Sequence, residues 1–195
     1  MNRLFKAAAL LCALVVGFTS CSKDDDKPLE KKLSDATATT ATATIQVPPG
    51  AKVYYDFKTN SKQEEDKSMI NLSGMYGSTL QNSSPGNYKM AYFDKENTSI
   101  EKLTLSAVLS SDITATDKLS IDASSAGTPA TGPTWIIYDF KNNHAVYPIP
   151  NRYIVMYKGE KLNDNADELY IIQAAGITAI NGTATYNLNF KKFTK

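Results

Sequence analysis

Residues 181–190 read NGTATYNLNF, and they carry the clearest structural signal in the chain. The Asn-Gly pair that opens the stretch is typical of a tight turn between antiparallel strands. Apolar and polar residues then alternate, and the apolar set is Ala184, Tyr186, Leu188 and Phe190. A period of two residues places that set on one face of a strand. The stretch therefore predicts a hairpin turn followed by a half-buried β-strand.

The same short-strand pattern extends upstream through the chain. Further strands are expected over Val53–Phe57, Lys89–Phe93, Lys102–Leu109, Tyr153–Tyr157 and Leu169–Ala174. No window has convincing spacing for an amphipathic helix, and Asp112–Ile121 is short and ambiguous. About seven or eight short strands with Gly, Asn and Pro turns predict a single all-β domain over residues 43–195, an antiparallel β-sandwich or a related architecture.

A six-residue motif occurs twice in the sequence. Tyr55–Asn60 reads YDFKTN and Tyr138–Asn143 reads YDFKNN. Each copy ends an aromatic strand at a polar turn, where asparagine tolerates the left-handed backbone that such turns need. Two similar strand ends are the simpler interpretation, and an internal duplication is the alternative.

Residues 1–20 have the features of an export signal. Arg3 and Lys6 precede an apolar run over Ala7–Phe18, which is too short to span a membrane. The sequence FTSC then ends at Cys21, and small residues before a cysteine resemble the lipobox of bacterial lipoproteins. That resemblance implies cleavage immediately before Cys21 and lipid attachment there, which anchors a protein without a spanning segment. An ordinary signal peptide with a chance cysteine is the alternative.

Residues 21–42 are expected to form a flexible tether. The run SKDDDK after Cys21 resembles the acidic export signal of Bacteroidetes surface lipoproteins, which implies exposure on the cell surface at the outer membrane. Retention in the periplasm is the alternative. The following LSDATATTAT has little apolar surface to bury. Because Cys12 lies in the expected signal, the mature chain has one cysteine and no intrachain disulfide is expected.

Composition and motifs exclude several function classes. The formal net charge of +1 gives no reason to expect a nucleic-acid partner. The sequence contains no GxSxG elbow, P-loop, HExxH or dinucleotide-binding glycine pattern. His144 is the only histidine, so a Ser-His or Cys-His pair would have to use it. A non-catalytic protein is therefore expected, and a hydrolase built on His144 is the alternative.

The C-terminal part resembles the HmuY family of haem-binding lipoproteins. The resemblance is carried by the strand that begins at Trp135, the pair Asn151-Arg152, the run YIVMY, the turn YKGEK and the final alternating strand. A looser likeness covers Thr44–Asp94. Phe140 stands where the family has a ligand histidine, so that ligand does not transfer by position.

The resemblance implies haem as cofactor, capture of haem for iron acquisition, and delivery of haem to an outer-membrane receptor. The alternative is a surface lipoprotein of the same fold that does not bind haem and has a structural, glycan-binding or protein-binding role.

A haem site needs an apolar slot, one or two iron ligands and polar groups for the propionates. Imidazole and thioether groups both bind haem iron. The candidate iron ligands are His144, Met75, Met90 and Met156. The candidate propionate partners are Arg152 and Lys158. The alternative interpretation is a surface histidine, methionines that fill the core, and solvated charges at strand ends.

Overall fold

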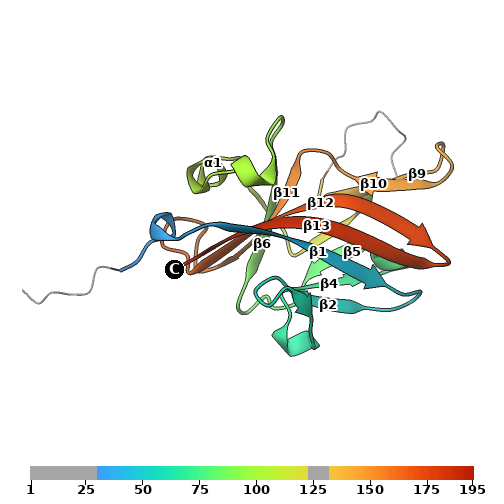
Figure 1. Ribbon diagram of the computed structural model, residues 1–195, viewed down its shortest axis with the longest axis horizontal. Helices are drawn as coiled ribbons and strands as arrows, with labels where there is room; N and C mark the ends of the chain where they lie inside the picture. Colours follow the sequence, from blue (N-terminus) through green and yellow to red (C-terminus); the bar gives the residue numbers. More distant parts are fainter. Residues whose placement is uncertain (1–29, 123–131) are drawn as a thin grey trace, which may run out of the picture. The chain divides into compact units, whose positions relative to one another are not determined.

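The described part of the protein is built from two β-sheets (Figure 1). A computed structural model describes residues 30–122 and 132–195, and residues 31–195 form one compact unit. The expected export signal and Cys21 lie outside the described residues. None of the helices in the described part is long and apolar enough to cross a membrane.

The first sheet has six strands in the order β1-β13-β12-β11-β6-β7, and all of its pairs are antiparallel. The bounds are β1 Thr39–Val47, β6 Lys89–Asp94, β7 Thr114–Ala115, β11 Arg152–Lys158, β12 Glu168–Ile180 and β13 Thr183–Thr194. In Figure 1, β12 and β13 form a long hairpin with β1 beside it. The C-terminal alternation thus forms a strand after a hairpin turn, as predicted.

The second sheet has seven strands in the order β10-β9-β8-β5-β4-β2-β3. The bounds are β2 Val53–Asp56, β3 Ser61–Lys62, β4 Ile70–Ser73, β5 Thr79–Asn82, β8 Lys118–Asp122, β9 Thr134–Asp139 and β10 Ala145–Pro148. The β8–β9 pair is parallel, whereas the other pairs are antiparallel. The all-β class is confirmed, and this one pair departs from a purely antiparallel arrangement.

The main core lies between the two sheets, which confirms a sandwich-like arrangement. The first sheet contributes Ile45, Met156, Ile172, Tyr186, Leu188 and Phe190. The second sheet contributes Ile70, Leu72, Leu80, Leu119, Trp135 and Ile136. Between Thr183 and Phe190 of β13 the buried residues are those at alternate positions, and they all belong to the main core, whereas Phe193 is buried in a second core.

A second core covers the outer face of the first sheet. It is formed by one short α-helix, α1 (Leu105–Leu109), and by 3-10 turns η1 (Leu33–Asp35) and η4 (Ile100–Lys102), which contribute Leu33, Ile100 and Val108. These side chains pack near Tyr153 and Val155 of β11. Because both faces of β11 are covered, its sequence YIVMY is an unbroken apolar run rather than an alternating one.

The predicted strand over Lys102–Leu109 is wrong. The chain forms the end of η4 there and then α1. Thr104 is the N-cap, and its hydroxyl accepts a hydrogen bond from the Ala107 N–H at 3.1 Å. The alternating sequence was misleading because Leu103 and Val108 both reach the second core from a cap and a single helical turn.

The ordered domain also begins earlier than the expected boundary at residue 42. β1 starts at Thr39, which pairs with Lys192 of β13. Leu33 is fully buried, and its N–H donates to the Asp164 carbonyl at 2.8 Å. The sequence TTATATIQV is poor in large apolar residues and so resembles a tether. Its β-branched threonines nevertheless suit a pleated strand at the edge of a sheet.

The repeated YDFK motif forms similar turns at the ends of β2 and β9. In each copy the aspartate accepts hydrogen bonds from the main-chain N–H groups two and three residues further on, at 3.0–3.3 Å. Asn60 and Asn143 then have φ values of 52° and 51°. The copies are therefore two strand ends with the same capped turn, which agrees with the simpler interpretation of the motif.

One contact distinguishes the two turns. The Thr59 hydroxyl donates to Asp56 Oδ2 at 2.9 Å. Asn142 occupies the corresponding position in the second copy, and Asp139 Oδ2 is buried with no hydrogen-bond partner among the described residues. A buried oxygen without a partner destabilises the fold, so the second turn is the less favourable of the two.

Candidate functional site

A pocket of about 690 Å³ lies between the ends of the two sheets. Its walls come from the second sheet and its β9–β10 turn (Ile121, Ile136, Tyr138, His144 and Val146), from the β12–β13 hairpin (Ile177, Ala179, Gly182, Ala184 and Tyr186) and from the segment that connects β4 and β5 (Met75, Tyr76 and Ser78). Most of these side chains are aliphatic or aromatic. The volume and the lining are typical of a site for a small, largely apolar molecule.

One wall of the pocket is formed by the second half of β12, a strand that is longer than the sequence predicts. The expected strand ended at Ala174, but β12 continues to Ile180 after a change of register between Ala174 and Gly176. Beyond this irregularity, Ile177 and Ala179 line the pocket. The irregularity interrupts the alternation of side chains along the strand, so the second half of β12 could not be read as a continuation of the first.

His144 is presented by the turn between β9 and β10. Tyr138 and Val146 are paired across these two strands, which fixes the base of the turn. Asp139 caps the turn from β9, and the Ala145 N–H donates to the Asn142 carbonyl at 3.0 Å. His144 itself has a left-handed backbone with φ 57° and is exposed. The hairpin thus places the only imidazole of the chain at the pocket.

The imidazole of His144 has one specific polar partner. The Tyr138 hydroxyl lies 2.6 Å from Nδ1, and the two rings stack with centroids 5.8 Å apart and an interplanar angle of 29°. Nε2 has no hydrogen-bond partner in the described part of the chain. A histidine that is held through one ring nitrogen and free at the other has the arrangement that metal ligands commonly use.

Met75 lines the same pocket from the segment between β4 and β5, which is distant from His144 in the sequence. It begins the 3-10 turn η3 (Met75–Gly77), and its side chain is 77% exposed. Two core aromatics hold this segment: Tyr186 donates to the Tyr76 carbonyl at 2.7 Å, and Trp135 Nε1 donates to the Ser78 carbonyl at 2.8 Å. Burial raises the pKa of the Tyr186 phenol well above its ordinary value, which keeps it a donor.

Gly77 is required by the packing of this segment. Its φ is 75°, and a Cβ atom at this position would lie 2.9 Å from both Cγ atoms of Val47. Tyr76 also has a left-handed backbone, with φ 53°. The tight approach of η3 to β1 keeps the backbone of the Met75 segment against the sandwich.

Met90 and Met156 do not line the pocket. They face each other on β6 and β11, they are 2% and 0% exposed, and both belong to the main core. Thioethers buried among aliphatic side chains fill space, which is the alternative interpretation of these two residues. Of the four candidate iron ligands, the structure brings together His144 and Met75.

Arg152 is committed to interactions within the protein. Its guanidinium is 5% exposed and donates from Nε and Nη2 to the Asp94 carboxylate, at 2.8 Å each. Nη1 donates to the carbonyls of Gly132 and Thr134 at 2.9 and 2.6 Å. The guanidinium also lies 4.6 Å from the centroid of the Tyr92 ring. Arg152 therefore joins β11, β6 and the start of β9, which argues against the expected contact with a propionate.

Lys158 also lies away from the pocket. It is the last residue of β11, it pairs with Glu168 at the beginning of β12, and its side chain is exposed. The pocket is formed by the opposite end of β12, beyond Ala174. The alternative interpretation of Lys158, a solvated charge at a strand end, agrees with this position.

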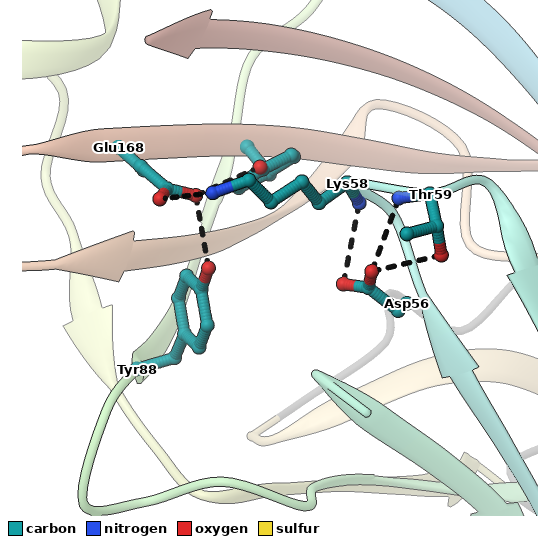
Figure 2. A network of polar contacts seen from close by, with 6 residues as sticks. Asp56, Lys58, Thr59, Tyr88 and Glu168 are labelled. Atoms are coloured by element: carbon teal, nitrogen blue, oxygen red, sulfur yellow. Dashed lines mark hydrogen bonds and ion pairs between the residues drawn. The ribbon is translucent and has the colours of Figure 1, made fainter. Parts of the chain in front are cut away.

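A second polar cluster surrounds Glu168 (Figure 2). Lys58 Nζ donates to one carboxylate oxygen at 2.9 Å, and the hydroxyls of Tyr88 and Tyr170 donate to the other at 2.9 Å. Burial alone would raise the pKa of Glu168, but these three donors outweigh it and lower the pKa. Burial, the hydrogen bonds and the negative charge of Glu168 raise the pKa of both tyrosines. The cluster ties the β2–β3 turn to β12 and is satisfied within the protein.

The structure also bears on the hydrolase alternative. In the described part of the chain, the His144 ring bonds the Tyr138 hydroxyl rather than a serine or an aspartate. The same described residues include no group of three His, Cys, Asp or Glu side chains that could hold a metal ion. The pocket is lined by one imidazole and one thioether, those of His144 and Met75.

Sequence reasoning missed three aromatic residues of the site, namely Tyr76, Tyr138 and Tyr186. Tyr138 has a sequence signal, because it lies two residues from Ile136 in one strand and residues with this spacing share a face of the sheet. Both residues line the pocket. Tyr186 was identified only as an inward-facing strand residue. Its hydrogen bond to the Tyr76 carbonyl joins residues distant in sequence, and no local pattern indicates such a contact.

Comparisons with known proteins add one weak structural likeness. No family model matches the sequence, and no curated protein matches it. The chain is similar to the solved structure of apo PinO from Porphyromonas gingivalis, with a TM-score of 0.44 and 10% sequence identity. The match covers 82% of this chain and 100% of PinO. This likeness is too weak to assign a family or a function to the chain.

Proposed function

We propose that the pocket binds haem, with His144 and Met75 as the iron ligands. The observation that carries the proposal is that the only imidazole of the chain and an exposed thioether line the same apolar pocket. They come from different elements, the β9–β10 turn and η3. A planar apolar molecule with a metal at its centre uses such walls and such donors together.

The residues present fit the chemistry of the group. Pockets for small ligands and cofactors commonly have volumes of roughly 300–1,000 Å³, and this pocket has about 690 Å³. Aliphatic residues such as Ile136, Val146 and Ile177 would cover the porphyrin faces. When bound, haem supplies an iron centre, and an imidazole with a thioether is a known ligand pair for it. None of the described lining residues is cationic, so solvent would meet the propionate charges.

We further propose that a lipid at Cys21 anchors the protein to the outer membrane and that bound haem is passed on to an outer-membrane receptor. The apolar run over Ala7–Phe18, the sequence FTSC and the acidic run after Cys21 support this proposal. The role is capture and delivery, in which the protein's own residues bind and orient the ligand and make no covalent change to it.

Titration with hemin at micromolar protein, in oxidising and in reducing buffer, tests the binding proposal. A shift of the Soret band is expected in both states. His144→Ala and Met75→Ala should each weaken binding by at least about tenfold. The loss in Met75→Ala should be larger for reduced iron, because the thioether is a soft ligand. Lys158→Ala, which changes an exposed residue outside the pocket, is the matched control and should bind as the wild type does.

Absence of a Soret shift in both oxidation states would contradict the haem proposal. It would favour a surface lipoprotein of this fold with a structural, glycan-binding or protein-binding role. Equal affinity of the wild type and both pocket variants would contradict the proposed ligands instead, and would show that haem binds elsewhere on the protein.

A further inference from the structure

We infer that Tyr138 is a positioning residue for His144, an inference that rests on the proposed function for the identity of the ligand. The Tyr138 hydroxyl engages Nδ1 and leaves Nε2 as the ring nitrogen that meets a ligand in the pocket. Both residues line the pocket, and their polar atoms are 2.6 Å apart.

The two residues differ in how firmly the fold holds them. Tyr138 is half-buried on β9 and is paired with Val146 of β10, so its backbone is fixed by the sheet. His144 is exposed in a turn and has a left-handed backbone. An exposed imidazole on a turn can rotate and present either ring nitrogen. Stacking on Tyr138 and the hydrogen bond to its hydroxyl remove that freedom.

The hydroxyl group suits this task because it can both accept and donate a hydrogen bond. A neutral imidazole that binds a metal through Nε2 carries its proton on Nδ1, and the Tyr138 oxygen then accepts that proton in a hydrogen bond. Without a ligand the hydroxyl can rotate and donate to Nδ1 instead. In both cases Nδ1 is engaged. Partners of this kind typically strengthen metal binding by roughly 10–100-fold.

Ligand-free NMR tests the positioning directly, because His144 is the only histidine and gives a single pair of ring ¹⁵N signals. Tyr138→Phe keeps the stacked ring and removes the hydroxyl. The Nδ1 chemical shift is expected to change in this variant, with a smaller change at Nε2. Tyr157→Phe, a half-buried tyrosine on β11 outside the pocket, is the control and should leave both shifts unchanged. Identical Nδ1 shifts in the wild type and Tyr138→Phe would overturn the inference.

Hemin binding supplies a second readout through a double-mutant cycle. Tyr138→Phe should weaken hemin binding by about 10–100-fold when His144 is present. It should have no further effect in the His144→Ala background, measured in the reduced state where Met75 still supplies a ligand. An equal loss in both backgrounds would assign Tyr138 a direct or structural contact and overturn the positioning role. If wild type binds no hemin, the proposed function fails, and the ligand-free NMR result alone decides whether Tyr138 holds the ring.

Discussion

Replacing Arg152 with methionine should destabilise the fold and leave hemin binding unchanged. Methionine keeps an apolar stem of similar length and removes every donor of the guanidinium. The variant therefore loses the paired contacts to Asp94 and the hydrogen bonds to the carbonyls of Gly132 and Thr134. These contacts join three strands, so their loss is expected to affect the whole sandwich.

The size of the effect follows from the exposure of each partner. The Asp94 side chain is 54% exposed, so water can replace the guanidinium there and that half of the interaction contributes little. Removing the charged donor from the two carbonyls costs about 1.5–3 kcal/mol for each bond. Release of the guanidinium from its nearly buried position offsets part of this. We expect a net loss of about 3 kcal/mol, which lowers Tm by roughly 6–12 °C in a domain of this size.

Thermal and urea unfolding followed by circular dichroism measure this loss, and hemin titration well below the Tm measures binding. Lys158→Met is the matched control, since it also removes a cation from β11 but changes an exposed residue, and both readouts should stay at wild-type values. Stability within about 0.5 kcal/mol of the wild type, together with a tenfold loss of hemin affinity, would refute the structural role and restore Arg152 as a propionate contact.

Three further changes test the rest of the fold. Asn142→Thr should raise the free energy of unfolding, measured by urea titration, by about 1 kcal/mol, because the hydroxyl of the introduced threonine can reach the unpartnered Asp139 Oδ2. No gain in stability would contradict that geometry. Glu168→Gln should lower stability by roughly 1–3 kcal/mol at pH 7. In the wild type, a Glu168 carboxyl with a lowered pKa stabilises the fold above about pH 4.5 and loses this contribution as it is protonated. The variant should therefore lose less stability than the wild type below about pH 4.5. An unchanged pH profile would count against the cluster. Tyr186→Phe should lower stability by about 1 kcal/mol, because it removes the hydrogen bond to the Tyr76 carbonyl. In the wild type the buried Tyr186 phenol has a raised pKa and resists ionisation, so the fold loses stability above about pH 10, and the variant should lose less there. An equally steep loss in the variant would argue against a buried Tyr186 phenol.

The sequence predicts the fold best where one face of a strand is buried. β13 alternates from Thr183 to Phe190, and the turn and the inward residues of this part are as expected. β1 was missed in part because its first four residues, Thr39–Thr42, are all exposed and show no alternation of buried positions. α1 was read as a strand because one helical turn is too short to show its period. The parallel β8–β9 pair has no local signature, since strand direction is decided by how the intervening chain returns.

The candidate site was predictable in its chemistry and not in its assembly. His144 stands out as the only histidine, and Met75 as one of few thioethers outside the expected export signal. Nothing local indicates that η3 and the β9–β10 turn meet at one pocket, because the contact depends on how the two sheets pack. The same packing buries Met90 and Met156, whose strand positions gave no sign of which face is inward.

The most direct test of the haem proposal is methyl NMR of methionine-labelled protein with reduced, diamagnetic haem. A methyl group on a ligand sulfur lies over the porphyrin and shifts strongly upfield. The Met75 methyl is predicted to show this shift in the wild type and to lose it in Met75→Ala, while the Met90 and Met156 methyls keep the positions they have without haem. An upfield shift of Met90 or Met156, or of no methyl at all, would contradict Met75 as an iron ligand in this pocket.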